Sequence, residues 1–88
     1  MEYKVFYVKV QITHEDVDID RCPCWSTKVI FEDTFASRIE AVRMAQKKLD
    51  RQPVNGYVTD VWAAVWSQTI TDKGLKAGKR IYNKYKHD

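Results

Sequence analysis

The residues with the clearest potential for chemistry in this 88-residue chain lie between positions 14 and 24. Two thiols, Cys22 and Cys24, and the imidazole of His14 are of the types that bind zinc, and a nearby carboxylate would complete a tetrahedral site. The two thiols are separated by a single residue, however, whereas paired zinc cysteines usually have two to four residues between them. Since the chain has no second cysteine pair, the spacing predicts free thiols and neither a bound metal nor another cofactor.

The same segment carries aspartates at alternate positions, which resemble the beginning of a calcium-binding loop. Such a loop needs glycine where Arg21 stands and a closing glutamate where Thr27 stands. A Cys22–Cys24 disulfide is also unfavourable, because Cα atoms two residues apart in an extended chain are ~6.6 Å apart, at the long limit for a bridge. The pattern therefore predicts a solvated acidic loop, with contact to a basic partner as the alternative.

Catalytic residue patterns are absent from the sequence. The three glycines, Gly56, Gly74 and Gly78, fall in expected turns and form no phosphate-binding loop. A cysteine–histidine nucleophile would need a third group to orient it, and the acidic loop is too polar to raise a carboxyl pKa by burial. A chain of 88 residues also leaves little room for a deep pocket. The sequence predicts a protein that is not an enzyme.

Positive charge is concentrated at the end of the chain. Residues 73–88 carry six Lys/Arg and one Asp/Glu, whereas residues 1–36 carry four and seven. Cations contact phosphates and aromatic rings stack on bases, so one hypothesis is a nucleic-acid-binding segment. Its residues would be Lys76, Lys79, Arg80, Tyr82, Lys84, Tyr85 and Lys86. The alternative is that these lysines protect an edge strand from aggregation.

The elements that position these groups follow from the periodicity of apolar residues. Alternation over residues 3–12 predicts a strand, and its parity changes after Thr13, which indicates a turn or bulge near residues 13–15. Cys22-Pro23-Cys24 is expected in a connection, because proline cannot donate to a central ladder. Alternation then resumes over residues 25–33, which predicts a second strand paired with the first as a hairpin.

A helix and two more elements complete the chain. Ser37 followed by Glu40 is a capping-box pattern that begins a helix over about 38–50. A strand is expected over residues 57–70, turns at 72–74 and 77–78, and a last strand or short helix over 79–85. The apolar stripe of the helix is expected to comprise Ile39, Val42, Ala45 (or Met44) and Leu49. The prediction is one small α+β domain over residues 1–88, with β-β-α-β-β order and a mostly antiparallel sheet carrying the helix on one face.

The strand over residues 57–70 is apolar on both faces, which is typical of a central strand covered on both sides. One helix covers one face, and the small and branched residues Val61, Ala63 and Val65 favour close packing against it. The other face would carry the aromatic residues Tyr3, Tyr7, Trp62 and Trp66. Either the C-terminal segment covers this face, or a second copy does, or it binds a partner.

We therefore expect a non-enzymatic binding module that docks a sheet face or edge onto a protein partner, with self-association and nucleic-acid binding as alternatives. No apolar run reaches the roughly 18 residues of a membrane span. The N-terminus begins directly with strand alternation and shows no signal-peptide pattern, so a cytoplasmic location is expected. Small charged domains of this kind occur among accessory and inhibitor proteins of phages and mobile elements, an analogy that rests on size and charge.

Overall fold

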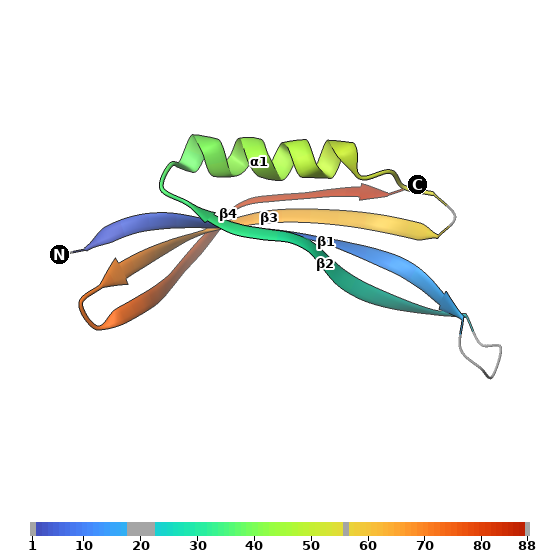
Figure 1. Ribbon diagram of the computed structural model, residues 1–88, viewed down its shortest axis with the longest axis horizontal. Helices are drawn as coiled ribbons and strands as arrows, with labels where there is room; N and C mark the ends of the chain where they lie inside the picture. Colours follow the sequence, from blue (N-terminus) through green and yellow to red (C-terminus); the bar gives the residue numbers. More distant parts are fainter. Residues whose placement is uncertain (1, 18–22, 56, 88) are drawn as a thin grey trace.

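The structure of the chain is a computed structural model that describes residues 2–17, 23–55 and 57–87. Within these ranges, four antiparallel strands form one sheet in the order β2-β1-β3-β4, and a single helix lies on one face of it (Figure 1). The elements are β1 (Tyr3–Val17), β2 (Pro23–Phe35), α1 (Arg38–Arg51), β3 (Val58–Thr71) and β4 (Gly74–His87). The predicted α+β class and the β-β-α-β-β order are confirmed.

The sheet has a bulge on β3, opposite the Thr13–His14 step of β1. Thr13 pairs with Asp60 and His14 pairs with Val58, so Thr59 is an extra residue on β3. An extra residue in one strand redirects the side chains that follow it without breaking the ladder. The predicted irregularity is therefore confirmed as a bulge, and β1 continues past it to Val17.

The placement of Pro23 and Cys24 in a connection is wrong, because β2 begins at Pro23. In the sheet order, β2 is an edge strand, and proline is tolerated at the first residue of such a strand, where no ladder N–H is needed. The hairpin of β1 with β2 is confirmed by the register, in which Cys24 pairs with Asp16. Cys22 lies outside the described residues.

The helix begins where the capping pattern predicts. The Ser37 hydroxyl accepts a hydrogen bond from the backbone N–H of Glu40 at 3.4 Å. The buried residues of the helix are Ala41, Ala45 and Leu49, which follow one another at intervals of four. Ile39 is 64% exposed, so its assignment to the apolar stripe is wrong. Ile39 lies two positions before Ala41, or about 200° around the helix, and it points away from the sheet.

The core lies between α1 and one face of β1 and β3. Val61, Ala63 and Val65 are fully buried, together with Val8 and Val10 of β1. The predicted face assignment is confirmed. Alanines on both α1 and β3 allow the helix to approach the sheet closely, and the branched residues fill the space on either side.

Glycines have two different roles around β4. Gly74 adopts a φ of 121° directly after the tight turn at residues 72–73, a conformation that favours glycine. The turn predicted at Ala77–Gly78 is wrong, because both residues lie inside β4. A Cβ atom on Gly78 would lie 2.2 Å from the backbone oxygen of Ser67, so the sequence needs glycine there for close approach of two strands.

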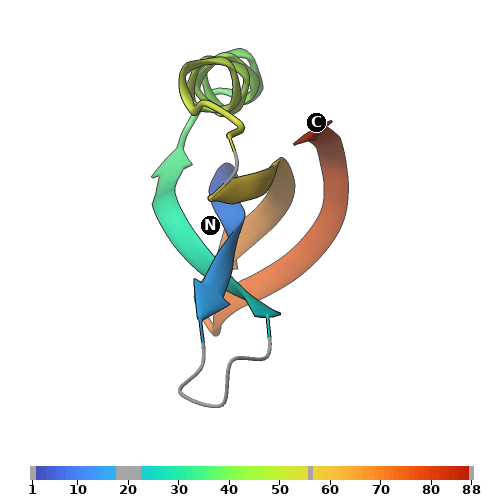
Figure 2. The same ribbon diagram turned by 90° about the vertical axis from the view of Figure 1, so that its right-hand side faces the viewer.

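The C-terminal segment is the edge strand β4 and does not lie across the second face of the sheet. In the view along the long axis, α1 lies above the twisted sheet, and no other element of the described ranges lies on the opposite face (Figure 2). The molecule measures 54 × 26 × 16 Å, with a radius of gyration of 15.7 Å. A compact domain of this length would have a radius of gyration of about 12 Å. The fold is therefore unusually elongated and thin.

Candidate functional site

The candidate site is the surface of the sheet opposite α1, which we call the open face. Side chains alternate between the two faces of a strand, so the buried residues that contact α1 identify those that point the other way. The pairing register then aligns them in rows across the sheet, for example Tyr7 with Trp66 and Trp66 with Arg80. On the open face lie Tyr3, Val5, Tyr7, Lys9 and Gln11 of β1; Glu32 and Thr34 of β2; Trp62, Ala64, Trp66, Gln68 and Ile70 of β3; and Leu75, Ala77, Arg80, Asn83 and Tyr85 of β4.

Four rings at the centre of this face form a continuous chain, the aromatic cluster of Tyr7, Trp66, Trp62 and Tyr85. Successive ring centroids are 5.7 Å, 5.8 Å and 6.1 Å apart. The Cα atoms of Trp62 and Trp66 must be ~13 Å apart along the strand, so the two rings lean toward each other. Between them Ala64 is fully buried, although it points away from the helix. The rings therefore form a layer over β3 and shield it from water.

Hydrogen bonds hold two rings of the cluster in place. The Tyr7 hydroxyl donates to the carboxylate of Glu32 on β2, and the indole N–H of Trp62 donates to the side-chain oxygen of Asn83 on β4. The hydrogen bond to Glu32, with burial and the negative charge of that carboxylate, raises the pKa of Tyr7 to about 12. Because the polar atoms of both rings already have partners, the surface that the cluster presents is mainly ring carbon.

The predicted partner-binding residues do not all lie together. Tyr7, Trp62 and Trp66 belong to the aromatic cluster, whereas Tyr3 is 57% exposed at the end of β1, opposite Ile70. Sequence reasoning missed Tyr85 as a member of the cluster. Its spacing from Tyr82 indicated opposite faces, but the pairing of β4 with β3 that brings Tyr85 beside Trp62 was needed to place it.

The basic residues proposed for nucleic-acid binding are divided between the two faces of β4. Arg80 and Tyr85 lie on the open face, opposite Trp66 and Trp62. Lys84 and Lys86 lie opposite Ala63 and Val61, on the side of α1. Lys76 and Lys79 are exposed nearer the start of the strand.

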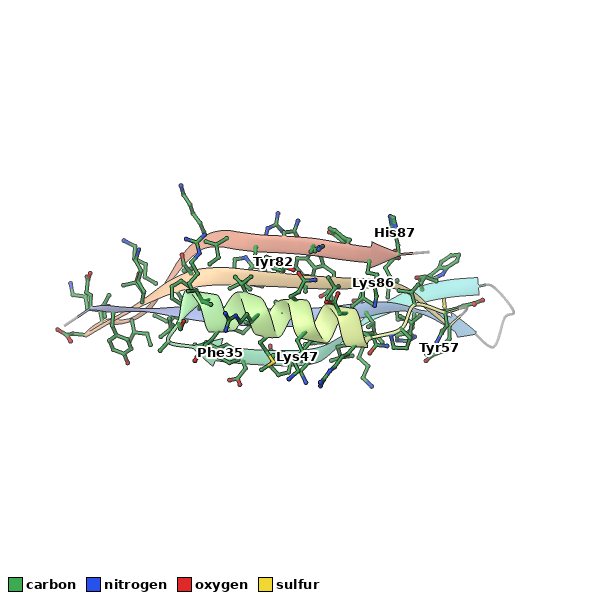
Figure 3. All side chains as sticks on the ribbon, turned by 90° about the horizontal axis from the view of Figure 1, so that it is seen from above. Phe35, Lys47, Tyr57, Tyr82, Lys86 and His87 are labelled. Atoms are coloured by element: carbon green, nitrogen blue, oxygen red, sulfur yellow. The ribbon has the colours of Figure 1, made fainter. Side chains whose placement is uncertain are left out.

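The contacts of Tyr82 and Lys86 confirm that they belong to the helix side of β4 (Figure 3). The Tyr82 hydroxyl donates to the side-chain oxygen of Gln46 at 2.7 Å, and the Lys86 ammonium donates to the backbone oxygen of Asp50 at 3.3 Å. Burial, followed by the negative charge of Asp50, raises the pKa of Tyr82. These two residues thus join β4 to α1.

Two of the candidate metal ligands, His14 and Cys24, lie near the loop end of the β1–β2 hairpin. The His14 ring stacks on Tyr57 with centroids 5.3 Å apart, and the backbone N–H of Glu15 donates to the backbone oxygen of Tyr57 at 2.8 Å. Cys24 is exposed on β2, and Cys22 lies outside the described residues. The part of the chain that the structure describes contains no group of three His, Cys, Asp or Glu side chains able to hold a metal ion.

A hollow of about 520 Å³ lies along one flank of α1. It is lined by Val42, Arg43, Gln46, Lys47, Asp50 and Arg51. These residue types do not provide a nucleophile with an adjacent base, which covalent catalysis requires. The open face is therefore the better candidate for a functional surface.

Comparisons with known proteins provide no family for the chain. No protein-family model matches it, and neither a curated protein nor a solved structure is detectably similar. Within the described residues, no helix has both the length and the apolar character needed to cross a membrane.

Proposed function

We propose that this chain is a non-enzymatic binding module whose open face docks onto a protein partner. The observation that supports this most directly is the aromatic cluster, which lies on the side of the sheet that α1 leaves uncovered. A small charged module of this kind suits an accessory or inhibitor protein of the sort carried by phages and mobile elements, acting in the cytoplasm.

The composition of the open face resembles the centre of a protein interface. Tryptophan, tyrosine and arginine contribute most of the binding energy in such interfaces, and all three meet in the row formed by Tyr7, Trp66 and Arg80. The hydroxyl of Tyr7 and the indole N–H of Trp62 are already hydrogen-bonded within the chain. A partner can therefore cover these rings without leaving either polar atom unpaired.

The exposed area of the chain is also large for its mass. The accessible surface is 6341 Å², whereas a folded monomer of 10.4 kDa exposes about 5,400 Å². The surplus is about 900 Å². Strand ends extend beyond the helix on both sides, so neither face of the sheet is covered there (Figure 1). A protein interface of standard size buries about 800 Å² on each partner. One such interface would bring the exposed area close to the ordinary value.

Nucleic-acid binding is the second candidate, and the composition of β4 favours it. Gly74–His87 contains five lysine or arginine residues and no acidic residue. However, Lys84 and Lys86 point to the side of α1, away from the rings that would stack on bases. A single strand of nucleic acid could not contact all of these cations and also stack on the aromatic cluster, because two of them lie on the opposite side of the sheet. Docking of a protein is therefore better supported.

Site-specific photo-crosslinking in the native host tests the proposed function. A photoreactive phenylalanine analogue replaces Tyr85, which is 62% exposed beside the aromatic cluster, or Ile39, which is 64% exposed on α1, as the matched control. We expect a discrete protein adduct from position 85 and none from position 39. The adduct should disappear when Trp66→Ser is added to the chain. Equal labelling at both positions, or an adduct that survives Trp66→Ser, would contradict the proposal.

A further inference from the structure

We infer that the partner of the open face is a second copy of this chain, packed face to face about a two-fold axis parallel to the strands. The inference rests on the proposed function, since it names the protein that docks. In such a dimer each sheet has α1 on its outer face and the second sheet on its inner face. Both apolar faces of β3 are then covered, as its sequence requires.

The size of the open face suits this arrangement. Four strands at a spacing of ~4.8 Å give a width of ~19 Å, and the β1 residues from Tyr3 to Gln11 span ~26 Å. The flat footprint is therefore about 500 Å², and the accessible area is larger because the side chains project from the sheet. The flat footprint is about six tenths of the ~800 Å² that each partner of a standard interface buries, and the projecting side chains add to it. Sheets that pack in this way are ~10 Å apart.

A two-fold axis parallel to the strands brings complementary side chains together. The axis would pass between the two central strands, so β1 of one copy lies over β3 of the other. Because such an axis preserves position along the strands, Tyr7 lies over Trp66 of the second copy. Lys9 lies over Ala64 of the second copy, where its aliphatic stem can cover apolar surface and its charge can reach water.

Charge distinguishes this axis from the alternative one across the strands. In the sheet order β2-β1-β3-β4, an axis parallel to the strands places β4 over β2 of the second copy, whereas an axis across them places β4 over β4. The open face of β2 carries Glu32 and that of β4 carries Arg80. Arg80 belongs to the same cross-strand row as Thr34, and Glu32 belongs to the next row on this face. Arg80 of one copy would therefore lie over Thr34 of the other, next to Glu32. The parallel axis thus brings Arg80 of one copy near Glu32 of the other, whereas the other axis places each β4, with its Arg80, over the other β4.

The test combines light scattering with charge reversal on the full chain. We expect the parent to have twice the 10.4 kDa chain mass at high concentration and to dissociate on dilution. Arg80→Glu should raise the dimer dissociation constant about tenfold or more. Glu32→Arg should raise it too, but this change also removes the acceptor of the Tyr7 hydroxyl. Combined in one chain, the two reversals should therefore raise the dissociation constant by clearly less than the product of the two single effects. Lys84→Glu makes the same charge change on the same strand but on the α1 side, and it should leave the dissociation constant unchanged. Far-UV circular dichroism verifies that each variant is folded.

Each contrary outcome identifies what has failed. A parent that remains monomeric up to millimolar concentration overturns the inference. An effect of Lys84→Glu equal to that of Arg80→Glu also overturns it, and so does a double reversal whose effect equals the product of the two single effects. If the monomer still gives the adduct at position 85 with another protein, the proposed function stands and only the second copy is wrong. If the monomer instead binds an oligothymidylate with an affinity that falls steeply with salt, both are wrong and the nucleic-acid alternative replaces them.

Discussion

The orientation of α1 on the sheet predicts very different costs for two aliphatic residues of the same helix. Leu49 is 2% exposed and lies in line with Ala41 and Ala45 against the sheet, whereas Ile39 is 64% exposed. Leu49→Ala removes three carbons from a site surrounded by valines and isoleucine on paired strands, which cannot collapse into the space. We expect a loss of about 3 kcal/mol in the free energy of unfolding, within the ~2–5 kcal/mol range of such truncations.

That loss is a large fraction of the total stability. A domain of 88 residues has an unfolding free energy of about 4–13 kcal/mol, so Leu49→Ala should lower Tm by roughly 12–24 °C. Ile39→Ala removes the same number of carbons from solvent and should change the free energy by less than about 0.5 kcal/mol. Urea denaturation followed by tryptophan fluorescence measures both variants. The protein concentration is held constant, because dimerisation makes apparent stability depend on it.

Comparing two positions on one helix tests which side of α1 faces the sheet separately from whether α1 contributes to the core. A similar cost for Ile39→Ala and Leu49→Ala would show that α1 packs on the sheet through a different stripe. A negligible cost for both would show that the helix contributes little to the core. An altered denaturant slope would instead indicate that the substitution changed the unfolded state or broke two-state behaviour.

Three further substitutions test other parts of the structure. Val61→Asp puts a charge at a fully buried position facing α1 and should unfold the domain, which circular dichroism would reveal as lost secondary structure. Gly78→Ala puts a methyl group against the backbone of Ser67 and should cost more than about 1 kcal/mol in urea denaturation, with a null effect arguing against the close approach of the strands. Tyr7 should titrate late in ultraviolet absorbance, with a pKa of about 12 that Glu32→Gln returns toward 10. Because the folded pKa is the higher one, this hydrogen bond stabilises the fold fully below pH 10 and loses its effect as the pH rises toward 12.

The architecture could be predicted because strand parity is an unambiguous signal in β1 and β3. Alternation placed Val61 and Ala63 on one face and Trp62 and Trp66 on the other, and the size of the side chains indicated which face takes a helix. The structure bears out both assignments. Alternation predicts the faces of these strands reliably, because a shift of one residue in the pairing would move every buried side chain to the wrong face of the sheet.

The apolar stripe of α1 was harder to identify because its buried residues are small. Ala41 and Ala45 contribute little hydrophobicity, so the larger Ile39 dominated the pattern read from the sequence. Alanine is nevertheless what a helix needs where its backbone approaches a sheet closely. Hydrophobicity alone therefore selected an exposed residue, and the structure of the sheet was needed to correct it.

The last strand combines bulges with an exposed edge, and neither has a clear sequence signal. Ile81 and Tyr82 both pack against the core because β4 has an extra residue opposite the Val65–Trp66 step. Simple alternation had placed Ile81 with Tyr85 instead. An edge strand also has few buried residues, so its periodicity is weak, and the choice between strand and helix stayed open until its pairing with β3 was known.

The two edges of the sheet give a reason to expect docking through the face and not through strand addition. β2 begins with a proline and has a bulge at Ile30, while β4 has two bulges and lysines along its length. Proline, bulges and lysines are the features by which natural sheets prevent pairing with another strand. The centre of the open face is instead a layer of rings, with the charges of Lys9, Glu32 and Arg80 beside it. A chain whose edges resist association while one face carries a layer of half-buried aromatic rings is suited to bind through that face.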